Sequence, residues 1–199
     1  MKIFNAHIEK AEISTMPNVL FDGRIFVIDT IADTEKAVKA LSKERIIGID
    51  TETRPAFKKG VHYNVSLLQL STADTCFLFR LCRTGIPDAL IQLLENKEIT
   101  KVGLSLHDDY QALKRRRAFT PGGFLDLQKH VSEFGIEEMS LQKIYAIVFG
   151  QRISKNQQLS NWDIDVLTDK QKLYAATDAW ACLNIYNRLE QVKKGNVAC

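Results

Sequence analysis

The chain is poor in cysteine and proline and has no long uncharged apolar run. Its 199 residues include four cysteines and four prolines, with no internal repeat or low-complexity tract, so we expect a single domain over residues 1–199. The cysteines form neither a Cys-x-x-Cys pair nor a zinc-ligand spacing, which favours reduced thiols and an intracellular, cytoplasmic setting. Because no apolar run could span a bilayer, we expect a soluble, unexported protein without a membrane segment.

The chain also lacks a strong charge of either sign. It has 27 Lys and Arg residues against 24 Asp and Glu residues, with a net charge of +3 and a pI near 8.6. This balance is too mild to indicate a nucleic-acid-binding protein by itself, and it does not oppose one. Function must therefore be sought in particular residues.

Short runs rich in Ile, Val and Phe alternate with longer segments of helical period, which predicts a mixed α/β sheet flanked by helices. The predicted strands cover residues 24–28, 45–52, 65–72, 75–79 and 99–104, and the predicted helices cover residues 34–41, 87–95, 107–117 and 169–192. The turn-like Ala73-Asp74 between two strands indicates a hairpin, so three consecutive strands should be antiparallel.

Several polar residues are spaced to cap helices. Thr168 with Gln171 has the spacing of a capping box, and Ser105 with Asp108 has a similar spacing, with Asp in place of the usual Glu or Gln. Asp126 begins the next element, where we expect a cap or a hydrogen-bond acceptor. If Asp108 is structural in this way, its neighbour Asp109 is free for another role.

Three separated segments supply further acidic residues. On the strand predicted over 45–52, Asp50 and Glu52 project to the same face, while Thr51 faces the other side with the isoleucines of that strand. Asp109 follows a strand-to-helix junction in the middle of the chain. On the last helix, Tyr174 and Asp178 are one turn apart on one face.

Carboxylates brought within a few ångströms of one another would hold protons unless cations neutralise them, and hard divalent cations prefer oxygen ligands. The acidic residues therefore indicate a metal site for Mg²⁺ or Mn²⁺. Two cations roughly 4 Å apart can hold a phosphodiester, one activating a water and the other stabilising the leaving oxygen. A tyrosine one turn from a ligand, as Tyr174 is from Asp178, is placed to orient that water.

Each pattern is weak alone. Asp33 and Glu35 form a second Asp-x-Glu at a predicted helix start, where a capping role is the default, and Asp74 and Asp163 precede a leucine by four residues, as Asp109 does. Tyr-x-x-x-Asp, by contrast, occurs only once. The order of strand-borne Asp-x-Glu, mid-chain Asp and late helical Tyr-x-x-x-Asp is much harder to obtain by chance.

These residues resemble a known family, the DEDD exonucleases with a tyrosine in the last motif, and in particular the ribonuclease D group and the exonuclease domain of the Werner-syndrome helicase. The resemblance covers about residues 20–193. The matching segments are residues 47–52, 101–103, 109–113, 158–162 and 171–179. Before the last motif, Asp165-Val166-Leu167 stands where ribonuclease D relatives often have Arg-Pro-Leu, which puts details of substrate contact in doubt.

The resemblance implies a ribonuclease-H-like fold, a mixed sheet with helices on both faces, and removal of nucleotides from the 3′ ends of single-stranded DNA or RNA with two divalent cations. It implies that Asp50, Glu52 and Asp178 bind the cation that activates water, with Asp50 bridging to the second cation. Asp109 then serves that second cation, directly or through water, and Tyr174 hydrogen-bonds the attacking water. Because the sequence stops at residue 199, specificity is expected from this domain or a partner.

Other functions remain as alternatives. The same fold can serve as an inactive nucleic-acid-binding or protein-interaction module, whereas an endonuclease is disfavoured by the late Tyr-x-x-x-Asp. The basic run 114–117 could hold phosphates or be a solvated helix end. Phe57, Tyr63 and Tyr110 could stack terminal bases or belong to the core. Lys58, Lys59 and His62, which follow Glu52, could reach a substrate or form a polar loop.

Overall fold

The computed structural model describes residues 4–195, and within them the chain forms one six-stranded mixed sheet. The strands are β1 (Arg24–Ile28), β2 (Ile46–Glu52), β3 (Leu67–Ser71), β4 (Thr75–Arg80), β5 (Thr100–Gly103) and β6 (Phe124–Asp126), in the spatial order β1-β4-β3-β2-β5-β6. Strand β3 is antiparallel to both β2 and β4, and the other neighbours are parallel. The predicted mixed sheet and hairpin are thereby confirmed, and β6 is an additional edge strand.

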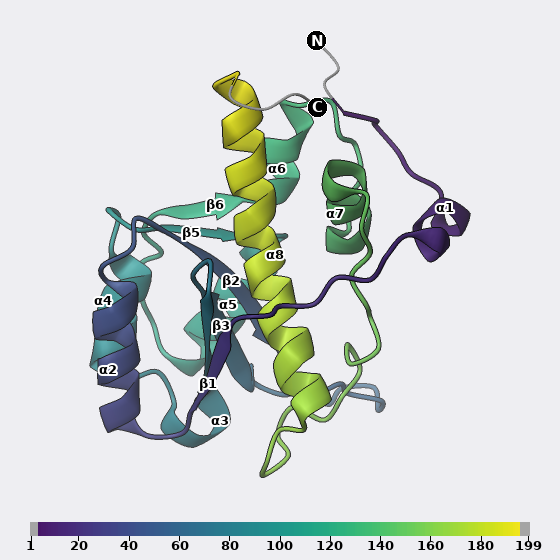
Figure 1. Cartoon of the computed structure of the whole chain (residues 1–199). Coiled ribbons are helices and arrows are strands. Elements are labelled where there is room, and N and C mark those ends of the chain that lie inside the picture. Colours follow the sequence, from purple (N-terminus) through teal and green to yellow (C-terminus); the bar gives the residue numbers. More distant parts are fainter. Residues whose placement is uncertain (1–3, 196–199) are drawn as a thin grey trace.

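The helices cover both faces of this sheet (Figure 1). They are α1 (Lys10–Thr15), α2 (Ile31–Leu41), α3 (Leu81–Thr84), α4 (Asp88–Glu95), α5 (Leu106–Arg116), α6 (Leu127–Ser132), α7 (Leu141–Phe149) and α8 (Asp169–Lys193). One core joins the sheet to α2, α4 and α5, and apolar clusters on the opposite face join it to α6, α7 and α8. Helix α8, drawn in yellow-green, crosses the sheet and packs on its central strands.

The capping residues fix where the long helices begin. Thr168 and Gln171 form the predicted capping box at the start of α8. Helix α2 begins at Ile31, three residues before the predicted start, because the Thr30 hydroxyl accepts a hydrogen bond from the Asp33 amide. Asp33, of the second Asp-x-Glu, thus lies in the first turn of a helix.

The predicted cap formed by Ser105 and Asp108 is wrong. The Ser105 side chain makes no capping hydrogen bond, and its backbone is left-handed, with φ of 56°. Asp126 takes over this role, because its carboxylate accepts hydrogen bonds from the Ser105 and Leu106 amides at 3.0 Å and also caps α6 through Gln128. The expectation that Asp126 is a cap or acceptor is confirmed, and it fixes the strand-to-helix turn before Asp109.

A glycine brings α8 onto β2. A Cβ atom at Gly48 would lie 1.9 Å from the Ala179 carbonyl oxygen of α8, so only glycine fits at this crossing. Two residues further along β2 comes Asp50, and one residue before Ala179 comes Asp178. The close crossing therefore sets the separation of these two carboxylates.

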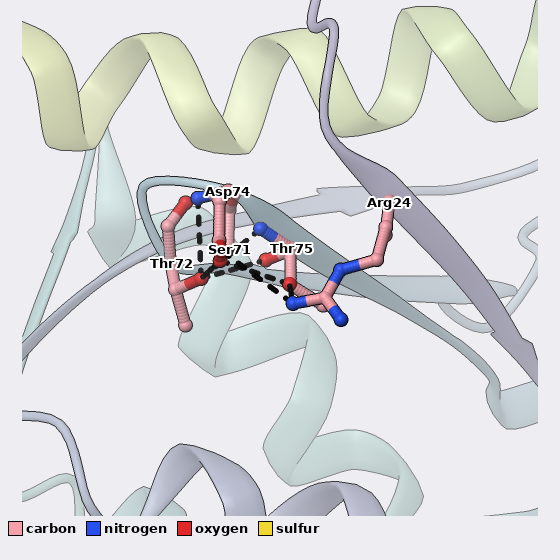
Figure 2. Close-up of polar contacts among 5 residues, drawn as sticks. All are labelled: Arg24, Ser71, Thr72, Asp74 and Thr75. Carbon is pink, nitrogen blue, oxygen red and sulfur yellow. Dashed lines mark hydrogen bonds and ion pairs between the residues drawn. The ribbon is translucent and has the colours of Figure 1, made fainter.

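The β3–β4 turn ties the hairpin to the edge strand β1. The Thr72 hydroxyl accepts a hydrogen bond from the Thr75 amide at 3.1 Å, and the Thr75 hydroxyl donates to Asp74 at 2.9 Å. Arg24 of β1 reaches both Asp74 and the Thr75 hydroxyl, as Figure 2 shows. This network accounts for Asp74 structurally, far from the other acidic motifs.

Among residues 4–195, no helix combines the length and the apolarity that a bilayer crossing requires.

Candidate active site

Three carboxylates meet where β2 passes under α8. Asp50, Glu52 and Asp178 each offer an oxygen atom, and these oxygen atoms all lie within 4.8 Å of one another. Asp50 and Glu52 share one face of β2, as expected from strand alternation, and the packing at Gly48 brings Asp178 to that face. Sequence positions 128 residues apart thus form one acidic cluster.

This cluster is shielded from solvent, and its carboxyl groups are shifted towards the protonated form. Glu52 is 9% exposed and Asp178 is 8% exposed. Burial raises the pKa of Asp50 and of Glu52, and the negative charge of Asp178 raises both further. Burial also raises the pKa of Asp178 to about 7. Three mutually repelling, partly desolvated carboxylates are the environment that a divalent cation would neutralise.

Tyr174 and Lys155 partly offset the rise in the pKa of Asp178. Hydrogen bonding with the Tyr174 hydroxyl, and then the positive charge of Lys155, lower the pKa of Asp178 against the effect of burial. Burial and the neighbouring carboxylates raise the pKa of Tyr174 itself, so this phenol is protonated near neutral pH. Tyr174 is therefore available as a hydrogen-bond donor at the cluster and not as a base.

Asp109 is not one of the three clustered carboxylates. Its carboxylate accepts a hydrogen bond from the Thr51 hydroxyl at 2.5 Å, and Thr51 lines the same cavity as Asp50 and Glu52. Burial raises the pKa of Asp109 to about 6, although the Thr51 hydrogen bond lowers it. The charge of Asp109 in turn raises the pKa of Asp50 and Glu52. Asp109 is thus held by Thr51 and is not the free side chain that the capping pattern suggested.

A cavity of about 320 Å³ opens onto the carboxylates. Its walls come from β2, α8, the start of α7 and the segment after α7, which contributes Ser154, Lys155 and Gln158. Lys155 is a residue that sequence reasoning missed, because a single lysine in a polar loop has no spacing that marks it. Among the described residues that line it, the cavity therefore combines three carboxylates with one cationic side chain.

The basic run 114–117 is largely occupied by structural contacts. Arg116 donates a hydrogen bond to the Val65 carbonyl, and Arg117 donates to the Ile86 carbonyl and pairs with Asp88. The Lys114 ammonium lies 5.6 Å from the centre of the Tyr110 ring. Tyr110, one of the candidate stacking residues, packs against the core cluster and contacts His107.

Comparison with known proteins identifies relatives of this chain. The profile of the 3′-5′ exonuclease family matches residues 25–193. The bifunctional 3′-5′ exonuclease/ATP-dependent helicase WRN of Mus musculus is 33% identical over 184 residues, which cover 87% of this chain and 13% of that protein. The chain thus spans a small part of this relative's length.

Solved structures share the fold of this chain. Escherichia coli RNase D superposes with a TM-score of 0.77 at 20% identity, over 86% of this chain and 46% of that chain. A Trypanosoma brucei RNase D complex with RNA U12 gives a TM-score of 0.74 at 26% identity, over 85% and 63%. The mixed sheet with helices on both faces is the ribonuclease-H-like fold, as expected.

Proposed function

The chain belongs to the 3′-5′ exonuclease family, and we propose that its described residues form one active exonuclease domain that removes nucleotides from 3′ ends of DNA or RNA. The observation that supports this proposal is the buried group of Asp50, Glu52 and Asp178. A structural role alone does not account for three mutually repelling acids in a cavity. Their raised pKa values mean that ionising them destabilises the folded state.

The donor set fits hard divalent cations such as Mg²⁺ or Mn²⁺. All three donors are carboxylate oxygens that lie within 4.8 Å of one another, and hard divalent cations prefer oxygen ligands. Asp50, Glu52 and Asp178 would hold one cation, and Asp109 would serve a second cation beside Asp50. Cations bound there supply Lewis-acid chemistry, which lowers the pKa of a water and neutralises charge on a phosphodiester.

The protein's own groups orient the reactants. Tyr174 stays protonated because burial and the surrounding carboxylates raise its pKa, so its hydroxyl can hold an attacking water by a hydrogen bond. Lys155 lines the same cavity, where its ammonium can bind a phosphate oxygen of the substrate. Thr51 fixes the carboxylate of Asp109, and the Gly48 crossing fixes Asp178 against Asp50.

The test is an end-specific degradation assay. Linear single-stranded DNA and RNA, labelled at the 5′ or the 3′ end, are incubated with Mg²⁺, Mn²⁺ or EDTA, with circular single-stranded DNA as a further substrate. The proposal predicts stepwise shortening from the 3′ end that needs a cation, leaves the circle intact and is absent from an Asp50→Ala, Asp178→Ala double variant. Cutting of the circle would indicate an endonuclease. Binding without degradation under every condition would indicate an inactive binding module.

A further inference from the structure

Gln69 is a buried polar side chain that the requirements of the fold do not explain. It lies on β3 and is 0% exposed. Among the described residues, neither its amide nitrogen nor its amide oxygen has a hydrogen-bond partner. A buried polar group without a partner destabilises the folded state, so a glutamine kept at this position needs a reason other than stability.

The pairing of β2 with β3 places Gln69 beside the acidic cluster. Gln69 is directly opposite Asp50 in this antiparallel pair, and Leu67, two residues earlier on β3, is opposite Glu52. Residues that face each other in this way share one side of the sheet, with Cβ atoms about 4.5–5.5 Å apart. The Gln69 amide therefore leaves the sheet on the same side as the Asp50 carboxylate.

The other neighbours of Gln69 on this face are poor partners for an amide. Leu78 of β4 lies opposite Gln69, and it belongs with Leu67 to the apolar cluster that packs against α8. Ser71, two residues after Gln69, already donates its hydroxyl to a backbone carbonyl. The Asp50 carboxylate is thus the hydrogen-bond acceptor that the register places next to the Gln69 amide.

Gln69 lies behind the carboxylates and outside the acidic cavity. Asp50 and Glu52 are among the described residues that line the cavity, and Gln69 is not. A group in this place can influence the chemistry through Asp50 and not by touching the substrate. Residues behind a metal site commonly fix its ligands by hydrogen bonds, and a glutamine amide has two N–H groups to donate.

We propose that Gln69 is a positioning residue, which donates a side-chain N–H to the Asp50 carboxylate when that carboxylate holds a divalent cation. The inference rests on the proposed function and deepens it by adding a residue that orients a ligand. A carboxylate has about four lone-pair positions, so Asp50 can face a cation and accept this hydrogen bond together. The bond also satisfies an amide that has no partner among the described residues.

The first test uses Gln69→Met, which removes the donor and keeps a side chain of similar length. We expect Mn²⁺ to bind about 10- to 100-fold more weakly by calorimetry, the usual effect of losing a hydrogen-bond partner behind a metal ligand. In EDTA, the Tm should equal or exceed that of the wild type, because the substitution removes an unpaired buried amide. A purely structural Gln69 would give the opposite pattern, a lower Tm with unchanged Mn²⁺ affinity.

Ser66→Ala is the matched control for this substitution. Ser66 directly precedes β3 and is 0% exposed, and its hydroxyl likewise has no partner among the described residues. Because Ser66 is three positions before Gln69, strand alternation directs its side chain to the opposite face. Ser66→Ala should therefore keep the Tm in EDTA at or above the wild-type value and leave the Mn²⁺ affinity unchanged.

A spectroscopic test observes the proposed hydrogen bond directly. In nuclear magnetic resonance spectra, the Gln69 side-chain amide signals, identified by their loss in Gln69→Met, should shift when Mg²⁺ is added. Gln171 is the internal reference, since its amide already donates to the Asn161 carbonyl at 3.2 Å and should keep its signals in place. Gln69 signals that do not move while Mg²⁺ saturates the protein would overturn the inference.

The outcomes separate this inference from the proposed function. Gln69-dependent Mn²⁺ binding by a protein that hydrolyses no nucleic acid would support the role of Gln69 and refute the exonuclease proposal. Stepwise 3′ shortening with equal Mn²⁺ affinity in the wild type and Gln69→Met would refute the role of Gln69 alone. A Gln69→Met variant whose rate falls at low Mn²⁺ and recovers at high Mn²⁺ would support both.

Discussion

The Gly48→Ala substitution tests the claim that one glycine sets the geometry of the candidate active site. The added Cβ would lie 1.9 Å from the Ala179 carbonyl oxygen and 3.2 Å from the Leu183 Cβ. The closer of these contacts is about 1.5 Å shorter than an ordinary van der Waals contact. Because the obstructing atom belongs to the backbone of α8, no side-chain rotation relieves the overlap. Helix α8 must move away from β2 and take Asp178 with it.

The expected losses of stability and of activity follow from this displacement. Overpacking in a close-packed interior costs about 1–3 kcal/mol and occasionally more, and the backbone clash places Gly48→Ala at the upper end. For a domain of this size, a loss of about 3 kcal/mol lowers Tm by about 6–12 °C. A displacement of about 1 Å in a catalytic constellation costs about 100-fold in rate. We therefore expect loss of both stability and activity from one methyl group.

The assay combines thermal unfolding with the rate of 3′ shortening, measured well below the Tm of the variant so that the protein is folded. Gly150→Ala is the matched control, since Gly150 has φ of +64° and no atom within 4 Å of an added Cβ. That control should lose about 1 kcal/mol through backbone strain and keep its activity. A Gly48→Ala variant as stable and as active as the Gly150→Ala variant would refute the reasoning.

Four further predictions concern charge and titration. Asp178→Asn should raise the free energy of unfolding in EDTA by about 1–3 kcal/mol, because it removes a buried repelling carboxylate; a lower value in urea unfolding would contradict this. Without metal, the free energy of unfolding should fall as pH rises from about 4 to about 7. Burial raises the pKa of Asp178 to about 7 and that of Asp109 to about 6. Between these pH values the folded chain therefore retains protons that the unfolded chain has lost. Added Mn²⁺ should flatten that profile, and calorimetry at each pH checks both statements. Relative to Lys101→Met, the wild type should gain stability from pH 8 to pH 10.5. Burial lowers the pKa of Lys101 to about 8, so the unfolded chain binds more protons than the folded chain in this pH range. Urea unfolding of both proteins measures this, and a difference in unfolding free energy that does not change with pH would refute it. Tyr174→Phe should lower kcat about 100-fold while Mn²⁺ affinity is kept, and loss of Mn²⁺ binding by titration would point to a structural role instead.

Local patterns predicted much of the sheet and of α8. Strand β1 matches the expected residues 24–28, and the capping box at Thr168 forms as expected. These features depend on residues close together in sequence, where alternation, helical period and capping chemistry act directly. The shared face of Asp50 and Glu52 was predictable for the same reason.

Features that depend on distant partners could not be predicted in this way. The Ser105 junction is capped by Asp126, 21 residues away, and nothing local distinguishes that carboxylate from the nearer Asp108. The hydrogen bond between Thr51 and Asp109 and the place of Lys155 in the cavity arise from packing of separate segments. The close crossing at Gly48 likewise needs the position of Ala179 on α8, which sequence spacing does not contain.

The measurement that tests the central claim most directly combines Mn²⁺ titration with the degradation of a 5′-labelled single strand, for the wild type and Asp178→Asn. The account predicts that the wild type binds Mn²⁺ and shortens the strand stepwise, and that Asp178→Asn, although folded, loses both properties. Equal stepwise shortening by the wild type in EDTA, or by Asp178→Asn in Mn²⁺, would contradict the claim that the cluster of Asp50, Glu52 and Asp178 is the catalytic metal centre.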